Sequence, residues 1–285
     1  VDADLIVASD PDADRIGAVV RDKNGNYQLI NGNQIVMILL NYLMVRNREM
    51  GRLTGNEYIV KTIVTTETIK AIAENNNIRM YDCYTGFKWI ASVIRDLEGT
   101  ARYLGGGEES YGFLAEDFAR DKDSVSAISL MAEICAWAKD RGMDFGEMLQ
   151  DIYVQNGYSH EEGISVVRPG KTGAEEIQAM MKGFRANPPK TLGGSPLIIV
   201  KDYADLSVHN LKDNSYGKMD FPTTSNVLQF FTEDGSKVSV RPSGTEPKIK
   251  FYIEVHSHIA SRDEFDAAEA AAKEKINAIK ADLGI

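Results

Sequence analysis

Between residues 58 and 104, short apolar runs alternate with stretches of helical periodicity, and this alternation limits the possible folds most strongly. It predicts strands at 58–64, 78–83 and 101–104, and helices at 66–74 and 87–97. Strands joined through crossover helices pair in parallel, and ligand sites in such sheets lie beyond the carboxyl ends of the strands. The sequence therefore predicts an α/β region here, and the glycine-rich segment 105–112 follows one of its strands.

The segments on either side have different patterns. Before this region, an apolar run at 4–8 predicts a buried strand, and the Asn24-Gly25 pair predicts a hairpin. The hairpin strands are expected at 16–21 and 27–30, with a helix at 33–46 behind them. After the region, a long apolar-faced helix is predicted at 124–141.

Beyond residue 158 the sequence changes character. The polar stretch 158–173, interrupted by Pro169, predicts a domain boundary. Strict alternation at 248–256 is typical of a half-buried antiparallel strand, with one apolar face and one wet face. Further strands are expected at 197–200, 227–232 and 238–240, and a final helix is expected to begin with a capping box of Ser261 and Glu264 and to bury Phe265, Ala268, Ala272, Ile276, Ile279 and Leu283.

These patterns predict an α/β protein with three parts. Residues 1–50 are interpreted as the end of one α/β domain, and 51–160 as a complete α/β domain with a mixed, mainly parallel sheet. Residues 161–285 are interpreted as a C-terminal α+β domain with an antiparallel sheet. The chain enters its first predicted strand directly at Val1, which indicates the edge of a fragment.

Charge and composition exclude several classes of partner. A net charge of −10 and a pI near 5.0 argue against nucleic acid or an anionic membrane as a partner, since both require excess Lys and Arg. No apolar run approaches the roughly 20 residues that span a bilayer. Cys83 and Cys135 match no metal or redox spacing, which favours a reducing cytoplasm.

Three carboxylates follow the first predicted strand at alternate positions, Asp10, Asp12 and Asp14. Hard divalent cations bind such oxygen ligands. A calcium-binding EF-hand loop would need Gly at its sixth position and Glu at its twelfth, where this chain has Arg15 and Arg21. A solvated acidic turn is the alternative, but clustered like charges are costly without a cation. The segment therefore favours a magnesium site.

Two further loops could contact a phosphorylated sugar. Residues 241–245 (RPSGT) supply a guanidinium, two hydroxyls and backbone N–H groups, the donors that phosphate requires, although an ordinary Pro/Gly turn is equally compatible. The glycines of 105–112 permit close approach, and Glu108, Glu109 and Ser110 can accept hydrogen bonds from sugar hydroxyls. A mobile surface loop is the alternative there. The charge run 120–123 is typical of a solvated face.

Together, four segments resemble motifs of the α-D-phosphohexomutase superfamily and occur in that family's order. They are 9–15 (SDPDADR), 85–88 (TGFK), 107–112 (GEESYG) and 241–247 (RPSGTEP). The resemblance implies a four-domain enzyme, of which 1–50 would end the metal-binding second domain, 51–160 would form the sugar-binding third and 161–285 the phosphate-binding fourth. A phosphoserine on the first domain would exchange phosphate with a hexose phosphate through a hexose 1,6-bisphosphate, so that phosphate moves between C1 and C6.

The resemblance also assigns roles to individual residues. Asp10, Asp12 and Asp14 would bind Mg²⁺. Arg15 and Lys88 are the implied catalytic residues: Arg15 would offset charge beside the phosphoserine, and Lys88 would help to hold the substrate. The remaining positions implied to bind substrate are Thr85, Gly86, Glu108, Ser110 and Lys122 for the sugar phosphate, with Arg241, Ser243, Gly244 and Thr245 for the distant phosphate.

No segment resembles the family's Thr-Ala-Ser-His-Asn-Pro serine loop, so we expect the chain to lack the N-terminal domains and to be inactive alone. Members that accept both glucose and mannose phosphates carry histidines where this chain has Phe87 and the Tyr111-Gly112 pair. The motif spellings resemble the branch that contains phosphoglucomutases and phosphopentomutases. Among phosphoglucomutase/phosphomannomutase-type activities, glucose phosphate is therefore the first expected substrate and pentose phosphate the second. A non-catalytic sugar-phosphate-binding module is a further alternative, which the retained Asp motif disfavours.

Overall fold

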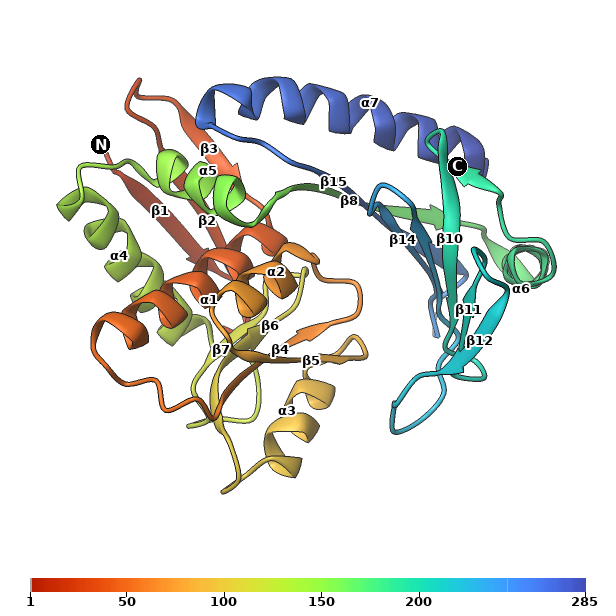
Figure 1. The fold of residues 1–285 in the computed structure, drawn as a ribbon, viewed down its shortest axis with the longest axis horizontal. Helices are drawn as coiled ribbons and strands as arrows, with labels where there is room; N and C mark the ends of the chain where they lie inside the picture. Colours follow the sequence, from red (N-terminus) through yellow and green to blue (C-terminus); the bar gives the residue numbers. More distant parts are fainter. Residues whose placement is uncertain (1, 245) are drawn as a thin grey trace. The chain divides into compact units, whose positions relative to one another are not determined.

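The computed structural model describes residues 2–244 and 246–285, and their contacts divide them into two units. The first unit comprises the described residues up to Tyr158 together with Ile259–Phe265. The second comprises Ser159–His258 and Asp266–Ile285. In Figure 1 the first unit runs from red to green, with its short segment Ile259–Phe265 in blue, and the second unit runs from green to blue. The three-part division at residues 50 and 160 remains a prediction.

The first unit begins with an antiparallel sheet in the order β1-β2-β3. Its strands are β1 (Leu5–Ser9), β2 (Ile16–Arg21) and β3 (Tyr27–Ile30). The predicted hairpin is confirmed, because β2 and β3 pair around a turn in which Gly25 has φ of 87°. The predicted burial of the first strand is wrong. β1 is an edge strand. Its Ile6 pairs with Val19 of β2, which in turn pairs with Leu29 of β3, and Ile6 and Leu29 are 48% and 66% exposed.

The α/β region follows, and its sheet has the order β5-β4-β6-β7. β4 pairs in parallel with β5 and β6, whereas β7 is antiparallel to β6, so the predicted mixed, mainly parallel sheet is confirmed. Tyr58, Val60, Ile90 and Leu114 belong to the core between this sheet and its helices. The elements are α1 (Gly32–Glu49), β4 (Glu57–Thr62), α2 (Thr68–Asn75), β5 (Arg79–Cys83), α3 (Phe87–Asp96), β6 (Arg102–Gly107), β7 (Phe113–Ala115), α4 (Ser124–Asp140) and α5 (Phe145–Asn156).

The second unit is built on a sheet in the order β12-β11-β10-β13-β14-β15-β8, with β9 paired to β10. Its strands are β8 (Tyr158–Val167), β9 (Thr191–Leu192), β10 (Ser195–Asp202), β11 (Ser207–Asn210), β12 (Ser215–Lys218), β13 (Leu228–Thr232), β14 (Lys237–Pro242) and β15 (Lys248–Ser257). The pairs from β12 to β15 are antiparallel, as predicted. β8 lies within the polar stretch that predicted only a boundary, because pairing with β15 gives a polar segment its strand conformation.

Two helices complete this unit, α6 (Gly170–Ala186) and α7 (Phe265–Leu283). The aromatic ring of Phe184 on α6 packs edge-on against Phe230 and Phe251 of the sheet. The predicted capping box is wrong, since Ser261 precedes a short 3₁₀ helix (Arg262–Glu264) and makes no side-chain cap bond. The buried face predicted for α7 is confirmed except at Ala268, which is half-buried.

The alternation of β15 is confirmed for its apolar face, on which Ile249, Phe251, Ile253 and Val255 are buried. Its other face is not uniformly wet. Glu254 is buried because its carboxylate pairs with Lys237 Nζ at 2.9 Å across the β14–β15 ladder.

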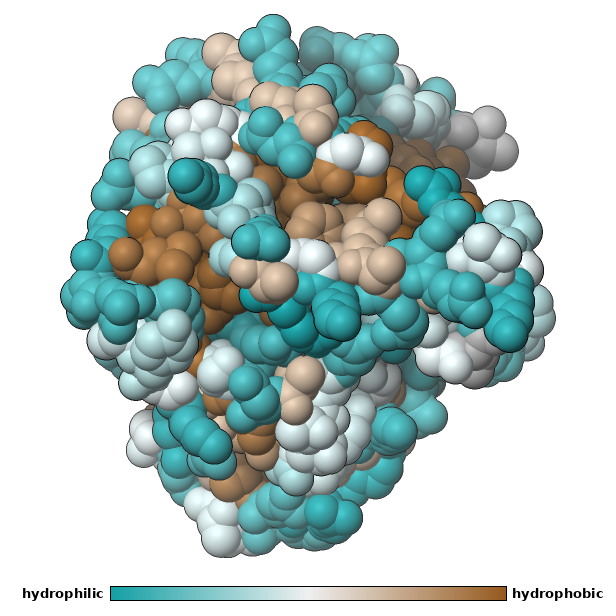
Figure 2. Space-filling view, turned by 90° about the vertical axis from the view of Figure 1, so that its right-hand side faces the viewer, coloured by the Kyte–Doolittle hydropathy of each residue, from teal (hydrophilic) through white to brown (hydrophobic). Residues whose placement is uncertain are grey.

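Hydrophilic residues cover most of the face in Figure 2, and hydrophobic residues gather in patches between them. Among the described residues, no helix combines the length and apolar character that crossing a membrane requires.

Candidate active site

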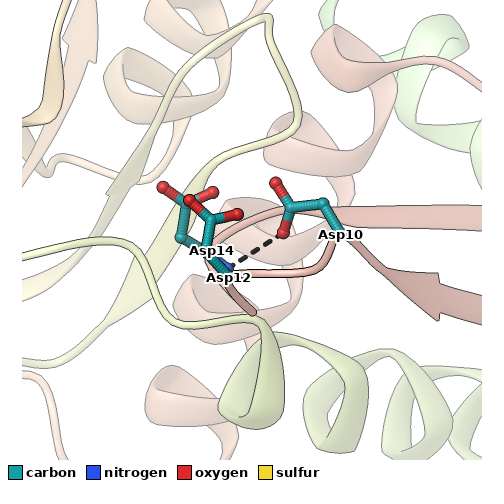
Figure 3. A group of neighbouring side chains, drawn as sticks. All are labelled: Asp10, Asp12 and Asp14. Atoms are coloured by element: carbon teal, nitrogen blue, oxygen red, sulfur yellow. Dashed lines mark hydrogen bonds between the residues drawn. The ribbon is translucent and has the colours of Figure 1, made fainter.

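The Asp10–Asp14 loop connects β1 to β2 and curls back on itself. Asp10 Oδ1 accepts hydrogen bonds from the backbone N–H groups of Asp14 at 3.1 Å and Arg15 at 3.0 Å. Ala13 takes a left-handed φ of 58°, which completes the turn. One carboxylate oxygen from each of Asp10, Asp12 and Asp14 lies within 4.8 Å of the others (Figure 3). Desolvation raises the pKa of Asp10, but these backbone donors outweigh it and the pKa is lowered overall.

The chemistry of this loop fits a hard divalent cation. Asp14 Oδ1 is buried and accepts no hydrogen bond from the described residues. Arg15 Nη1 lies 3.5 Å from that oxygen and 3.4 Å from Asp10 Oδ2, so it neutralises the carboxylates only partly. Because Mg²⁺ takes oxygen ligands at about 2.0–2.1 Å, an ion among these carboxylates would satisfy the buried oxygen.

Backbone contacts attach this loop to the glycine-rich segment 107–112. Arg15 and Gly112 form an antiparallel bridge, and the N–H of Ile16 donates to the carbonyl of Tyr111 at 3.2 Å. The N–H of Ser124, at the start of α4, donates to the carbonyl of Ala13 at 3.1 Å. The predicted metal and sugar segments therefore lie side by side.

Glu108 connects the sugar segment to a third predicted motif. Its side chain is buried, and Oε1 accepts a hydrogen bond from the N–H of Gly86 at 2.7 Å. Gly86 has φ of 108°, a conformation that residues other than glycine rarely adopt. The 85–88 and 107–112 motifs, which follow β5 and β6 respectively, thus meet at one edge of the sheet. Thr85 and Ser110 are half-buried beside these contacts in sequence.

Lys122 is the cation at the centre of these loops. Its Nζ lies 2.9 Å from Asp14 Oδ2 and 3.0 Å from Asp121 Oδ1, and 5.4 Å from the ring centroid of Phe87. Its stem crosses Gly112, where an added Cβ would lie 2.2 Å from Lys122 Cδ. Desolvation opposes the charged amine, but the hydrogen bonds to Asp14 and Asp121 raise its pKa. The interpretation of 120–123 as a solvated face is therefore wrong at Lys122, whose side chain is only 9% exposed.

Lys88 is exposed at the start of α3, with its amine 5.3 Å from the ring centroid of Trp89. It lines an open cleft of about 540 Å³ that also includes Arg95, Arg120 and Asp121. Asp121 binds Lys122, so this cleft adjoins the loops described above.

The second unit contains a separate cationic cavity of about 240 Å³, lined by Arg241, Pro242, Ser243, Glu246, Lys248 and Lys250. The turn between β14 and β15 shapes it. The N–H of Ser243 donates to the carbonyl of Lys248 at 2.8 Å, and Ser243 Oγ accepts from the N–H of Glu246 at 3.3 Å. A Cβ at Gly244 would meet no atom of the described residues within 4 Å, so packing against them does not require glycine there. The predicted position Thr245 lies outside the described residues.

Comparison with known proteins identifies the chain's relatives. The phosphoglucomutase/phosphomannomutase alpha/beta/alpha domain III matches residues 31–155, and the C-terminal domain of the same family matches residues 200–272. The chain belongs to the phosphoglucomutase/phosphomannomutase family. The α-D-phosphohexomutase resemblance indicated by the motifs is thereby confirmed.

Two bacterial phosphoglucomutases illustrate the likeness. The one from Staphylococcus aureus (strain MRSA252) is 36% identical over 251 residues, which cover 88% of this chain and 44% of the relative. The one from Staphylococcus haemolyticus (strain JCSC1435) is 34% identical over 256 residues, covering 90% of this chain and 46% of the relative. This chain therefore spans less than half the length of these family members.

Solved structures show the same fold at lower identity. The open form of the Paramecium phosphoglucomutase parafusin (pp63) has a TM-score of 0.61 at 20% identity, covering 99% of this chain and 46% of its own. A putative phosphomannomutase from Thermus thermophilus has a TM-score of 0.60 at 18% identity, covering 96% and 44% respectively.

Within this family member, the structure adds residues that motif reasoning missed. Asp121 and Phe87 hold Lys122, although no role was predicted for either. Lys248 and Lys250 line the cationic cavity of the second unit, and Lys250 is the cross-strand partner of Arg241. The available signal was the alternation of 248–256, which places both lysines on one face of the strand.

Proposed function

We propose that this chain carries the metal, sugar and distal-phosphate sites of a phosphoglucomutase, an isomerase that moves phosphate between C1 and C6 of glucose. One observation carries the proposal. An unbroken series of contacts runs from the carboxylate loop to the sugar motifs. Asp14 pairs with Lys122, whose stem packs on Gly112, and Gly112 lies beside Glu108, which accepts a hydrogen bond from Gly86. The names of the staphylococcal relatives support glucose phosphate as the substrate.

At the reacting phosphate, Asp10, Asp12 and Asp14 would hold Mg²⁺, which would neutralise charge on the transferring phosphoryl group. Arg15 lies at the same loop with a 44% exposed side chain, so its guanidinium is accessible to phosphate oxygens. Lys122 adds positive charge at this position through its pair with Asp14, and Lys88 would add more from the adjoining cleft. In-line phosphoryl transfer depends mainly on positioning and charge stabilisation, which these groups provide.

At the sugar, the Glu108 carboxylate would accept hydrogen bonds from hydroxyl groups. Its Oε1 is fixed by Gly86, and Oε2 lies 3.5 Å from the position of a Cβ at Gly112, towards the stem of Lys122. A carboxylate has about four acceptor sites, so this oxygen retains capacity for a ligand. Thr85 and Ser110 would supplement it with hydroxyl groups.

At the far end of the sugar, Arg241, Ser243 and Gly244 would bind the phosphate that is not reacting, together with Lys248 and Lys250. A hexose 1,6-bisphosphate carries such a second phosphate. The phosphoserine that donates phosphate would come from the N-terminal domains of the longer family members. Those domains are therefore the proposed partner of this chain.

Calorimetric titration with glucose 1,6-bisphosphate, with and without Mg²⁺, tests the proposal directly. We expect saturable binding that Mg²⁺ strengthens, and loss of that Mg²⁺ effect in Asp12→Asn. Ribose 1-phosphate serves as the comparison ligand, and tighter binding of it would replace the glucose assignment with a phosphopentomutase. A mutase assay of the full-length enzyme completes the test, because ligand binding with an inactive full-length enzyme would support a sugar-phosphate-binding module.

A further inference from the structure

We propose that the Lys122 amine takes the place of a metal ion in the Asp10–Asp14 loop, by pairing with Asp14 when no metal is bound. When a divalent cation binds the loop, Lys122 leaves Asp14 and becomes available to the substrate. This inference rests on the proposed metal site and adds a control of Lys122 by the metal. The metal would then do more than neutralise phosphate charge, because it would also decide when this lysine becomes available.

The first argument is that Lys122 and the cation need the same carboxylate. Lys122 Nζ lies 2.9 Å from Asp14 Oδ2, and Asp14 is one of the three residues whose oxygens converge. A divalent cation on Asp14 would either take this oxygen or bind the other oxygen of the same carboxylate. In the first case the ion pair breaks, and in the second two positive charges share one carboxylate and repel each other.

The second argument is that Lys122 has an alternative partner. Asp121 Oδ1 lies 3.0 Å from Nζ, and its side chain is 72% exposed. Rotation away from Asp14 would therefore leave the amine paired and at a more open position. The stem is guided by Gly112, which has no side chain to obstruct it, and by the face of Phe87.

Positive coupling between metal and anionic ligand follows from this arrangement. An ammonium group that has left Asp14 can donate to phosphate or sugar oxygens beside the 107–112 segment. If metal raises the affinity for the sugar phosphate by this route, the sugar phosphate must raise the affinity for metal by the same factor. The part of this coupling that exceeds the direct effect of the metal on the phosphate should disappear when Lys122 cannot carry charge.

The test uses Mg²⁺ and glucose 1-phosphate as probes in calorimetry of the wild-type chain and of Lys122→Met. Methionine retains an unbranched stem for Gly112 and Phe87 but removes the competing charge. We expect Lys122→Met to bind Mg²⁺ about 3- to 10-fold more tightly, because no ion pair has to be broken. We also expect Mg²⁺ to strengthen glucose 1-phosphate binding by a larger factor in wild type than in the variant, in which only the direct effect of the metal on the phosphate remains.

Lys139→Met is the matched control. Lys139 Nζ pairs with Asp4 Oδ2 at 2.6 Å, at the opposite end of β1 from the metal loop. Lys139→Met removes one positive charge from the first unit, as Lys122→Met does. Because this charge is not at the metal loop, the Mg²⁺ affinity of Lys139→Met should stay within twofold of wild type. A matching rise in both variants would indicate a general charge effect and would overturn the proposal.

An independent readout follows the lysine itself. Reductive ¹³C-methylation followed by NMR, with the Lys122 signal assigned from Lys122→Met, should show that signal shifting upon Mg²⁺ saturation. Mg²⁺ binding with an unmoved Lys122 signal and unchanged affinity in Lys122→Met would overturn the inference while retaining the metal site. Absence of Mg²⁺ binding to wild type would instead refute the metal site of the proposed function, and the inference with it.

Discussion

The loops of the first unit are assembled by residues far apart in the chain, whereas the cationic cavity of the second unit is formed by one hairpin. The Asp14 carboxylate pairs with the largely buried Lys122, and the backbone N–H of Gly86 donates to the buried carboxylate of Glu108. Arg241, Ser243 and Lys250 are adjacent because β14 and β15 are consecutive strands. This contrast implies that substitutions in the first site should lower the free energy of unfolding. Substitutions in the second site should change ligand binding with little effect on stability.

The largest effect is expected at Lys61, at the carboxyl end of β4. This fully buried amine lies 2.8 Å from Asp82 and 3.0 Å from Glu67. Lys61→Met leaves two carboxylates that are 35% (Asp82) and 24% (Glu67) exposed, so the loss should be smaller than for a fully buried pair. We expect the free energy of unfolding to fall by about 2–3 kcal/mol in urea denaturation. Lys70→Met is the control, because the Lys70–Glu74 pair is exposed and should contribute under about 0.5 kcal/mol. Equal small losses would contradict the coupling of this edge to stability.

The next effect is expected at Gly112. A Cβ there would overlap the stem of Lys122, so Gly112→Ala should displace that side chain and cost about 1–3 kcal/mol of unfolding free energy. We also expect at least tenfold weaker binding of glucose 1-phosphate. Gly17→Ala in β2 is the control, since a Cβ there would meet nothing within 4 Å. Unchanged glucose 1-phosphate binding in Gly112→Ala would contradict the proposed role of this series of contacts.

A purely functional effect is expected at Arg241. Its hydrogen bonds to phosphate would be charge-assisted, so Arg241→Ala should weaken glucose 1,6-bisphosphate binding by about 1.5–3 kcal/mol in calorimetry. The free energy of unfolding should change by less than about 0.5 kcal/mol, as is usual for surface positions. A loss of unfolding free energy as large as that expected for Gly112→Ala would show that the second site, like the first, contributes to folding stability.

The smallest effect concerns pH and His256 in the second unit. Burial alone would lower its pKa, but Glu254, whose Oε1 lies 2.9 Å from His256 Nε2, raises it overall, with Lys237 opposing and Glu161 adding to the effect. A raised pKa means that the protonated form stabilises the fold. That stability is fully present below the unfolded pKa of about 6.5 and is lost as pH rises through the higher folded value.

We therefore expect the free energy of unfolding to fall by under about 1 kcal/mol as pH rises from about 6 to 8, and His256→Asn to flatten this profile. Urea denaturation across that pH range measures it. A profile that is unchanged in the variant would assign the pH dependence to other groups.

Local patterns in the sequence predicted much of the fold and the identity of the motifs. The alternation at 58–104 indicated the parallel sheet, and the alternation at 248–256 indicated an antiparallel strand, because burial of one face imposes a period on each element. The spacing of Asp10, Asp12 and Asp14 indicated a cation site for a similarly local reason, since all three lie on one short loop.

Long-range packing, by contrast, determines which groups meet. The sequence pattern treats 120–123 as an ordinary charge run, and Lys122 enters the site because α4 begins beside the metal loop. Likewise Glu254 is buried on a strand face predicted to be wet because Lys237 lies directly across from it. Periodicity reports how each segment divides into faces, whereas the environment of a charged side chain depends on the neighbour that long-range pairing places beside it.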